Sequence, residues 1–255
     1  MQREEFLQQL WLDYIHQHTE VGALRLWPID TPVEYLALLT LNESPFAAAD
    51  LLPTLGHLGF RPSQRYAMAD RGLLVTLLAP PDDGPWLILA ELQMGTLSRE
   101  PRTRLAELVA NTHPQDARGQ NLLTRGRPWA MPDWASYRML CEAHPLAGWL
   151  SAMGPGMHHA GFDCERIGRG IDSLDEALGQ TGLKGSEDRQ YGLFPISPLL
   201  QYRFYPTCSR RIAFADGDEH RIPQGGLALL QKRLTSDHER AVELLLPHHT
   251  RCEIT

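Results

Sequence analysis

Residues 64–94 read QRYAMADRGLLVTLLAPPDDGPWLILAELQM, and this stretch decides the fold class. It contains three short apolar runs, at 64–68, 73–78 and 86–94. They are separated by Asp70-Arg71-Gly72 and by the proline-rich segment 80–85, whose residue types are typical of tight turns. The stretch therefore predicts three consecutive strands joined by turns.

The residues before this stretch predict one more strand and one helix. Residues 45–58 have a helical pattern, with Ser44 as the capping residue. Residues 21–27 form a short apolar run that is followed by Pro28, as at the end of a strand. The first half of the chain thus has the order β-α-β-β-β.

The same order returns in the second half. The pattern predicts a strand at 157–164, a helix at 171–180, and strands near 190–193, 199–205 and 212–215. Two such modules, neither able to close a core alone, would pack together around a shared cavity. The predicted fold class is α+β, with two β-α-β-β-β modules and flanking helices.

The remaining segments complete the predicted organisation. Helices are expected at 3–15, 97–111 and 134–153, and the tail at 227–246 also has a mostly helical pattern. Residues 112–133 are rich in proline, glycine and arginine, which favours a linker. The chain then divides into 1–111 with the first module, 112–133, and 134–255 with the second module, within one integrated domain.

Composition excludes several classes of function. The 255 residues carry a formal net charge of −7, so the chain lacks the basic excess typical of nucleic-acid binding. No apolar stretch is long enough for a membrane span. The four cysteines form no CxxC pair and the N-terminus has no leader pattern, so we expect a reduced, cytoplasmic protein.

Arg25 and Glu91 are two charged residues within apolar strand patterns. A guanidinium in such a strand is costly unless it pairs with a carboxylate. Arg25 could clamp an anionic substrate or form an internal ion pair with Glu91. Glu91 shares a strand face with Leu87 and Leu89, where it would be a metal ligand or the partner of an arginine.

His158 and His159 open the second module. Because neighbouring side chains on a strand point to opposite faces, only one of the two is expected to face the cavity. That histidine would be a hydrogen-bonded core residue or a metal ligand. The acidic segment 216–220 is interpreted as a hairpin turn, and the chain contains no nucleotide-binding or serine-hydrolase motif.

Nine short motifs occur in an order that matches one known family over residues 20–225. They are Gly22-Ala23-Leu24-Arg25, Ala69-Asp70-Arg71-Gly72-Leu73, Leu89-Ala90-Glu91-Leu92 followed by Leu97-Ser98, Pro128-Trp129, Trp134 to Tyr137, the His159 strand, Ile171-Asp172-Ser173-Leu174, Leu199-Leu200-Gln201 and Phe214-Ala215-Asp216-Gly217. By these motifs the chain resembles the 2-oxoadipate dioxygenase/decarboxylase family, also called D-2-hydroxyglutarate synthases. These proteins are relatives of the vicinal-oxygen-chelate fold.

The resemblance implies a two-module barrel around an Fe(2+) site. There a small 2-oxoacid chelates the metal, and oxygen drives its oxidative decarboxylation to a 2-hydroxy acid. By the same resemblance, His159 matches a metal ligand and Arg25 matches the arginine that holds the substrate carboxylate. Arg71 and Arg203 are further candidate anchors for a 2-oxoacid or dicarboxylate.

The sequence departs from the family at two expected ligands. Val21 stands where the family has its first metal histidine, and no acid occurs in residues 221–229, where its glutamate falls. Glu91 is the best-placed substitute, so His159 and Glu91 are the candidate ligands of a rebuilt metal site.

Three hypotheses remain open. The protein is an iron-dependent dioxygenase, a metal-free relative that binds a small carboxylate without catalysis, or a structural protein whose cavity is filled by side chains.

Overall fold

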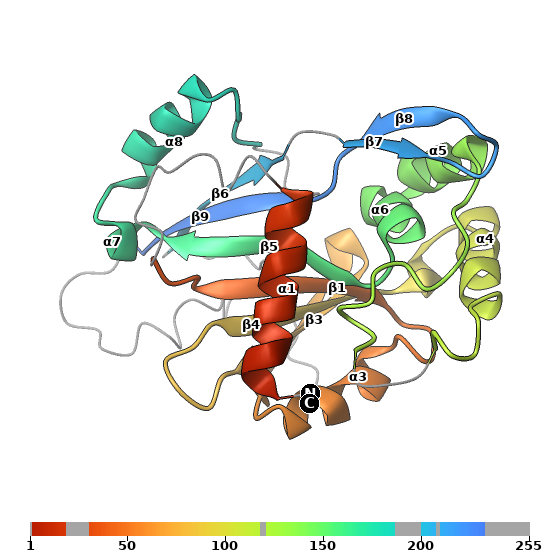
Figure 1. The fold of residues 1–255 in the computed structure, drawn as a ribbon, viewed down its shortest axis with the longest axis horizontal. Coiled ribbons are helices and arrows are strands. Elements are labelled where there is room, and N and C mark those ends of the chain that lie inside the picture. Colours follow the sequence, from red (N-terminus) through yellow and green to blue (C-terminus); the bar gives the residue numbers. More distant parts are fainter. Residues whose placement is uncertain (1, 19–30, 118–120, 187–199, 208–209, 233–255) are drawn as a thin grey trace.

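The structure is a computed structural model that describes residues 2–18, 31–117, 121–186, 200–207 and 210–232 (Figure 1). The predicted strands at 21–27 and 190–193 lie outside the described residues, and with them Val21 and Arg25.

In the described part of the chain, seven strands from both halves form one sheet in the order β2-β3-β4-β1-β5-β9-β6. The first half provides β1 (Tyr35–Leu41), β2 (Arg61–Met68), β3 (Leu73–Ala79) and β4 (Trp86–Leu92), and the second half provides β5 (Gly156–Asp163), β6 (Leu200–Pro206) and β9 (Gly226–Lys232). The three strands predicted within residues 64–94 are confirmed as β2, β3 and β4. The predicted α+β class is also confirmed.

The two halves have matching strand arrangements on either side of the antiparallel pair β1–β5. Strand β1 is parallel to β4, which is antiparallel to β3. Strand β5 is likewise parallel to β9, which is antiparallel to β6. Among the described residues the pairings form an open sheet that runs from β2 to β6, and they include none that would close the predicted barrel.

Two central strands were not predicted. Strand β1 (YLALLTL) was assigned no element, and β9 (GLALLQK) was assigned to the helical tail at 227–246, which is wrong for residues 227–232. Both are continuous apolar runs without polar alternation, as expected for strands that are buried on both faces. Such runs do not distinguish a strand from a buried helix, so pairing with neighbouring strands decided their structure.

Within the described residues, six longer helices and one short helix surround the sheet. They are α1 (Arg3–Gln17), α3 (Ala48–His57), α4 (Arg99–Ala110), α5 (Trp134–Ala143), α6 (Pro145–Met153), α7 (Cys164–Ile167) and α8 (Ile171–Gln180). The single helix predicted at 134–153 is divided at His144. Its backbone is extended (φ −164°, ψ 122°), as the following Pro145 requires.

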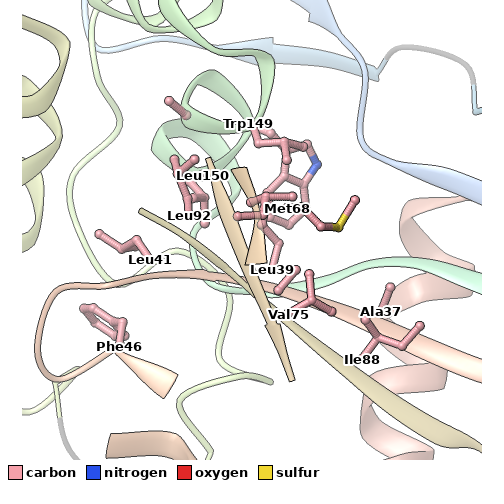
Figure 2. Packing of buried hydrophobic residues seen from close by; sticks show 14 of the residues in the cluster. Ala37, Leu39, Leu41, Phe46, Met68, Val75, Ile88, Leu92, Trp149 and Leu150 are labelled. Carbon is pink, nitrogen blue, oxygen red and sulfur yellow. The ribbon is translucent and has the colours of Figure 1, made fainter. Parts of the chain in front are cut away.

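Helices cover both faces of the sheet. On one face, which we call the α6 face, Ala37 and Leu39 of β1 pack with α4, α5 and α6 (Figure 2). On the other, the α1 face, Leu36 and Leu38 pack with α1, α3 and α8. Figure 1 shows α1 crossing the central strands. The position of a residue along each strand therefore determines which core it joins.

A separate hairpin, β7 (Arg210–Ala213) with β8 (Glu219–Ile222), contacts α5. The predicted turn at 216–220 is confirmed, because this segment connects the two strands and begins the second. The indole of Trp134 stacks on the ring of His220 with a centroid separation of 3.7 Å. In the described part of the chain, no helix combines the length and apolarity that crossing a bilayer requires.

Candidate functional site

The centre of the α6 face holds a hydrogen bond between Tyr35 of β1 and His159 of β5. The hydroxyl oxygen of Tyr35 lies 3.0 Å from Nε2 of His159, and both side chains are buried. The ring of Tyr35 occupies the space above Gly161, where a methyl group would overlap it. Gly161 thus makes room for the tyrosine beside His159.

His158 also reaches this cluster, contrary to the expected alternation of side chains. The pairing of β1 with β5 shifts between Ala37 and Leu38, whose partners are His159 and Met157, so His158 is the extra residue of a β-bulge. Its Nδ1 lies 3.0 Å from Nδ1 of His159. The prediction that the two histidines face opposite sides is wrong, because a bulge turns its extra side chain out of the regular alternation.

Tyr202 and Arg71 continue the cluster from two further elements. Tyr202 lies on β6, and Arg71 ends the 3-10 helix Ala69–Arg71 with only 8% of its surface exposed. Burial raises the pKa of Tyr202, whereas the nearby hydroxyl of Tyr35 and the positive charge of Arg71 act in the opposite direction. The pKa of Tyr35 is also raised, mainly by burial, so both hydroxyls keep their protons at neutral pH.

His144 supports the backbone at Arg71. Its Nε2 donates to the carbonyl oxygen of Arg71 at 3.0 Å, and its Nδ1 accepts from the backbone N–H of Leu146 at 3.1 Å. The same ring therefore caps the start of α6 and fixes the end of the 3-10 helix that carries Arg71.

His18 completes a group of three buried histidines. Its Nδ1 lies 2.5 Å from the hydroxyl of Thr207, and its Nε2 makes no hydrogen bond within the described residues. Burial lowers the pKa of His18 to about 4. Burial and the proximity of His18 lower the pKa of His158 to about 3, and burial together with the other two rings lowers the pKa of His159. All three imidazoles are uncharged at neutral pH.

Glu91, a predicted metal ligand, lies on the α1 face, opposite to His159. Its Oε1 accepts from the backbone N–H of Ala48 at 2.6 Å, and its Oε2 accepts from Nε2 of Gln93 at 2.7 Å. The carboxylate thus binds the first turn of α3, where a negative charge is favourable. The structure does not bring Glu91 and His159 together.

This position makes a structural role for Glu91 testable. We expect Glu91→Ala to lower the free energy of unfolding by about 2 kcal/mol, because it leaves the buried N–H of Ala48 without an acceptor. Urea denaturation measures the change, with Glu176→Ala on the exposed side of α8 as the control. A Glu91→Ala protein of unchanged stability that binds Fe(2+) more weakly than the parent would instead support the predicted metal ligand.

The predicted anchor residues separate in space. Arg203 lies on the α1 face, where it forms ion pairs with Asp172 at 2.8 Å and Asp175 at 2.6 Å on α8. Arg25 lies outside the described residues. Of the three predicted arginines, the structure places Arg71 in the cluster with His159.

The described residues do not bring together an iron centre of the expected kind. Such a centre uses two histidines and a carboxylate on one side of the metal. Within the described ranges, no three histidine, cysteine, aspartate or glutamate side chains are arranged to hold a metal ion. Both ring nitrogens of His159 lie at hydrogen-bonding distance from other side chains, and Glu91 is on the opposite face.

The sequence reasoning missed Tyr35 and Tyr202 as parts of the site, and it set His18 aside as a substitute metal ligand in favour of Glu91. Tyr35 lies in the apolar run that was not recognised as a strand. Tyr202 follows the alternation of β6, so a correct register of β6 on β9 would have placed it on the α6 face. His18 follows directly after α1, and no local signal connects it with β5.

Comparisons with solved structures find the same fold. A provisionally assigned hydrolase from Shewanella frigidimarina NCIMB 400 is 21% identical, with a TM-score of 0.79 over 92% of this chain and 94% of the other. The hydroxyglutarate synthase of Oryza sativa, crystallised with 2-oxoadipate, is 16% identical, with a TM-score of 0.79 over 98% and 87%. A provisionally assigned glyoxalase superfamily protein from Ralstonia eutropha JMP134 is 16% identical, with a TM-score of 0.61 over 78% and 71%.

Sequence comparisons add no closer relationship. No known family and no curated protein matches the chain by sequence. The similarity to solved structures shows that the chain has a glyoxalase-like fold shared with hydroxyglutarate synthase, and at these identities it shows the fold alone.

Proposed function

We propose that the protein binds a small 2-oxoacid or dicarboxylate on the α6 face, at the cluster of Arg71, Tyr202, Tyr35 and His159, without a resident iron. The observation that carries this proposal is the burial of Arg71, which is 8% exposed and whose positive charge acts on Tyr202, near the hydrogen-bonded pair of Tyr35 and His159. The proposal corresponds to the metal-free alternative left open by the sequence.

The chemistry of the cluster suits an anion. Arginine presents parallel N–H donors that match a carboxylate, and charge-assisted hydrogen bonds of this kind are stronger than neutral ones. Tyr202 and Tyr35 add hydroxyls that remain protonated at neutral pH. The nearby carboxylate of Glu34, whose negative charge acts on Tyr35, forms an ion pair with Arg166 at 3.4 Å.

The structural comparisons suggest 2-oxoadipate as the ligand with which to test binding. Hydroxyglutarate synthases from Oryza sativa and Pseudomonas putida, which share the fold, were crystallised with 2-oxoadipate. This compound has two carboxylates and a 2-oxo oxygen, so it offers several acceptors to the donors on Arg71 and the tyrosines.

The second candidate is iron-dependent oxidative decarboxylation of a 2-oxoacid, as the family resemblance implies. The position of His159 and the likeness to hydroxyglutarate synthase favour it. It requires ligands other than Glu91, supplied in part by residues outside the described ranges.

Titration calorimetry of chelator-treated protein with 2-oxoadipate tests the proposal. We expect binding by the wild-type protein and about 100-fold weaker binding by Arg71→Leu, because the variant loses charge-assisted hydrogen bonds in a buried site. Arg203→Leu is the matched control. Its side chain is paired with Asp172 and Asp175 on the opposite face, so affinity is expected to remain within about twofold.

Two results would change this conclusion. Equal affinity of wild type and Arg71→Leu, or no binding by the wild-type protein, would overturn carboxylate binding at this site. Oxygen uptake with 2-oxoadipate that requires added Fe(2+) and disappears in His159→Ala would replace the proposal with the iron-dependent reaction.

A further inference from the structure

His144 lies between two backbone segments, and each of its ring nitrogens has a backbone partner. The N–H of Leu146 at the start of α6 donates to Nδ1 at 3.1 Å, so Nδ1 carries no proton. Nε2 lies 3.0 Å from the carbonyl oxygen of Arg71, which can only accept a hydrogen bond. The ring is therefore uncharged and protonated at Nε2, and it donates to Arg71.

The turn that carries Arg71 is also held at its other end. The carbonyl oxygen of Gly72 accepts from the backbone N–H of Gln93 at 2.8 Å. Gly72 has a φ of +55°, which favours glycine, and a methyl group at this position would overlap the hydroxyl of Thr96. The turn is thus attached to the end of β4 through Gln93 and to the start of α6 through His144.

The position of the Arg71 guanidinium depends on the backbone of this turn. The residue is 8% exposed, so its close-packed surroundings leave the side chain few alternative positions. A shift of the backbone at Arg71 would therefore move the guanidinium with it. Binding groups have to be held within about 0.5 Å of their productive geometry, and the supporting hydrogen bonds provide this precision.

We propose that His144 is a positioning residue for Arg71. Its Nε2–H holds the backbone carbonyl of Arg71 and so places the guanidinium where it meets a carboxylate of the bound 2-oxoacid or dicarboxylate. This inference deepens the proposed function and rests on it for the identity of the ligand. The attachment of the turn to α6 does not depend on any ligand.

Two amide variants separate the two hydrogen bonds of His144. His144→Asn places an amide oxygen near the position of Nδ1, so it keeps an acceptor for Leu146 and loses the donor to Arg71. His144→Gln reaches the position of Nε2 with its amide nitrogen, so it keeps the donor to Arg71 and loses the helix cap. Asparagine replaces a residue that only caps α6, whereas glutamine replaces a residue that positions Arg71.

Amide hydrogen exchange measures the hold on the turn in the ligand-free protein. The N–H of Gly72 donates to Ala69 at 3.3 Å and the N–H of Gln93 donates to Gly72, so both amides report opening of the turn. We expect them to exchange about tenfold faster in His144→Asn than in the wild-type protein, since one net hydrogen bond is worth about a factor of ten. In His144→Gln the change should stay within about threefold.

Calorimetry with 2-oxoadipate measures the effect on binding. We expect about tenfold weaker binding by His144→Asn and a change of less than about threefold for His144→Gln. Each variant loses one hydrogen bond, so their melting temperatures should be similar and the affinity distinguishes them. Asp133→Ala is the control, because it removes the side-chain cap of the neighbouring helix α5, a bond of 2.7 Å to the N–H of Ser136. It should lower the melting temperature by about 3 °C and leave the affinity within about twofold.

The two measurements separate the positioning role from the proposed function. Equal affinities of His144→Asn and His144→Gln, or unchanged exchange at Gly72 and Gln93 in His144→Asn, overturn the positioning role. Absence of 2-oxoadipate binding by the wild-type protein overturns the proposed function. Faster exchange in His144→Asn than in His144→Gln would then still support the hold of His144 on the turn.

Discussion

Lowering the pH from about 7 to about 4 is expected to unfold the protein, because three buried histidines must gain protons for which the folded state has little affinity. His18, His158 and His159 are 0–2% exposed. Folding lowers the pKa of His18 from 6.5 to about 4 and that of His158 to about 3, in each case mainly through burial.

The direction of this pH effect on stability follows from how many protons the folded and the unfolded protein bind. Between pH 6.5 and 4 the unfolded chain binds protons at these histidines and the folded protein does not, so their contribution to stability is complete above pH 6.5 and is lost as the pH falls toward the folded values. A pKa that falls from 6.5 to about 4 corresponds to about 3 kcal/mol for His18 alone. Because whole domains are stable by about 5–15 kcal/mol, two or three such groups are sufficient for acid unfolding.

Urea denaturation at a series of pH values from 7 to 4.5 measures this effect. We expect the free energy of unfolding to fall steeply below pH 6.5, and His18→Gln to reduce the slope by up to about 1.4 kcal/mol per pH unit. His16→Asn, which changes an exposed histidine of α1, should leave the slope unchanged. A stability that is constant down to pH 4.5 would show that these side chains are not buried as the structure places them.

Gly161→Ala is expected to lower the free energy of unfolding by about 3 kcal/mol. The added methyl group would overlap the ring of Tyr35, which packs in the α6-face core and holds the hydrogen bond to His159. Moving this ring costs overpacking energy of about 1–3 kcal/mol and breaks a buried hydrogen bond worth about 1 kcal/mol. The same change should abolish measurable binding of 2-oxoadipate.

A matched glycine provides the control. Gly179 lies in α8 with open space at the position of its missing side chain, so Gly179→Ala should raise stability by up to about 1 kcal/mol. In a double-mutant cycle, Tyr35→Leu should cost much less in the Gly161→Ala background than in the wild-type protein. Additive effects of the two changes would contradict the proposed contact.

The strands of residues 64–94 were predictable because their signals are local. Turn residues such as those at 70–72 and 80–85 restrict the backbone wherever they occur, and short apolar runs between them have few alternatives to strands. The segments in the middle of the sheet lacked such signals. Strands β1 and β9 are apolar on both faces, so their conformation depends on partners far away in the chain.

The candidate site was likewise predictable only where local sequence signals exist. His159 could be singled out from its motif, and Arg71 from its place in a turn between strands. Glu91 was predicted to share a site with His159. A carboxylate in an apolar strand can instead accept hydrogen bonds from nearby backbone N–H groups, and here it accepts from Ala48 at the start of α3. Tyr35 could be assigned only once its strand was known.

Local residue chemistry was thus sufficient for the α+β class and for the turns between β2, β3 and β4. Long-range packing decided the rest, namely the pairing of β1 with β5, the bulge that turns His158 toward His159, and the separation of Arg71 from Arg203 and Glu91 onto opposite faces. The reason is physical. Which face a strand residue joins depends on register, register is set by the partner strand, and a single extra residue reverses it.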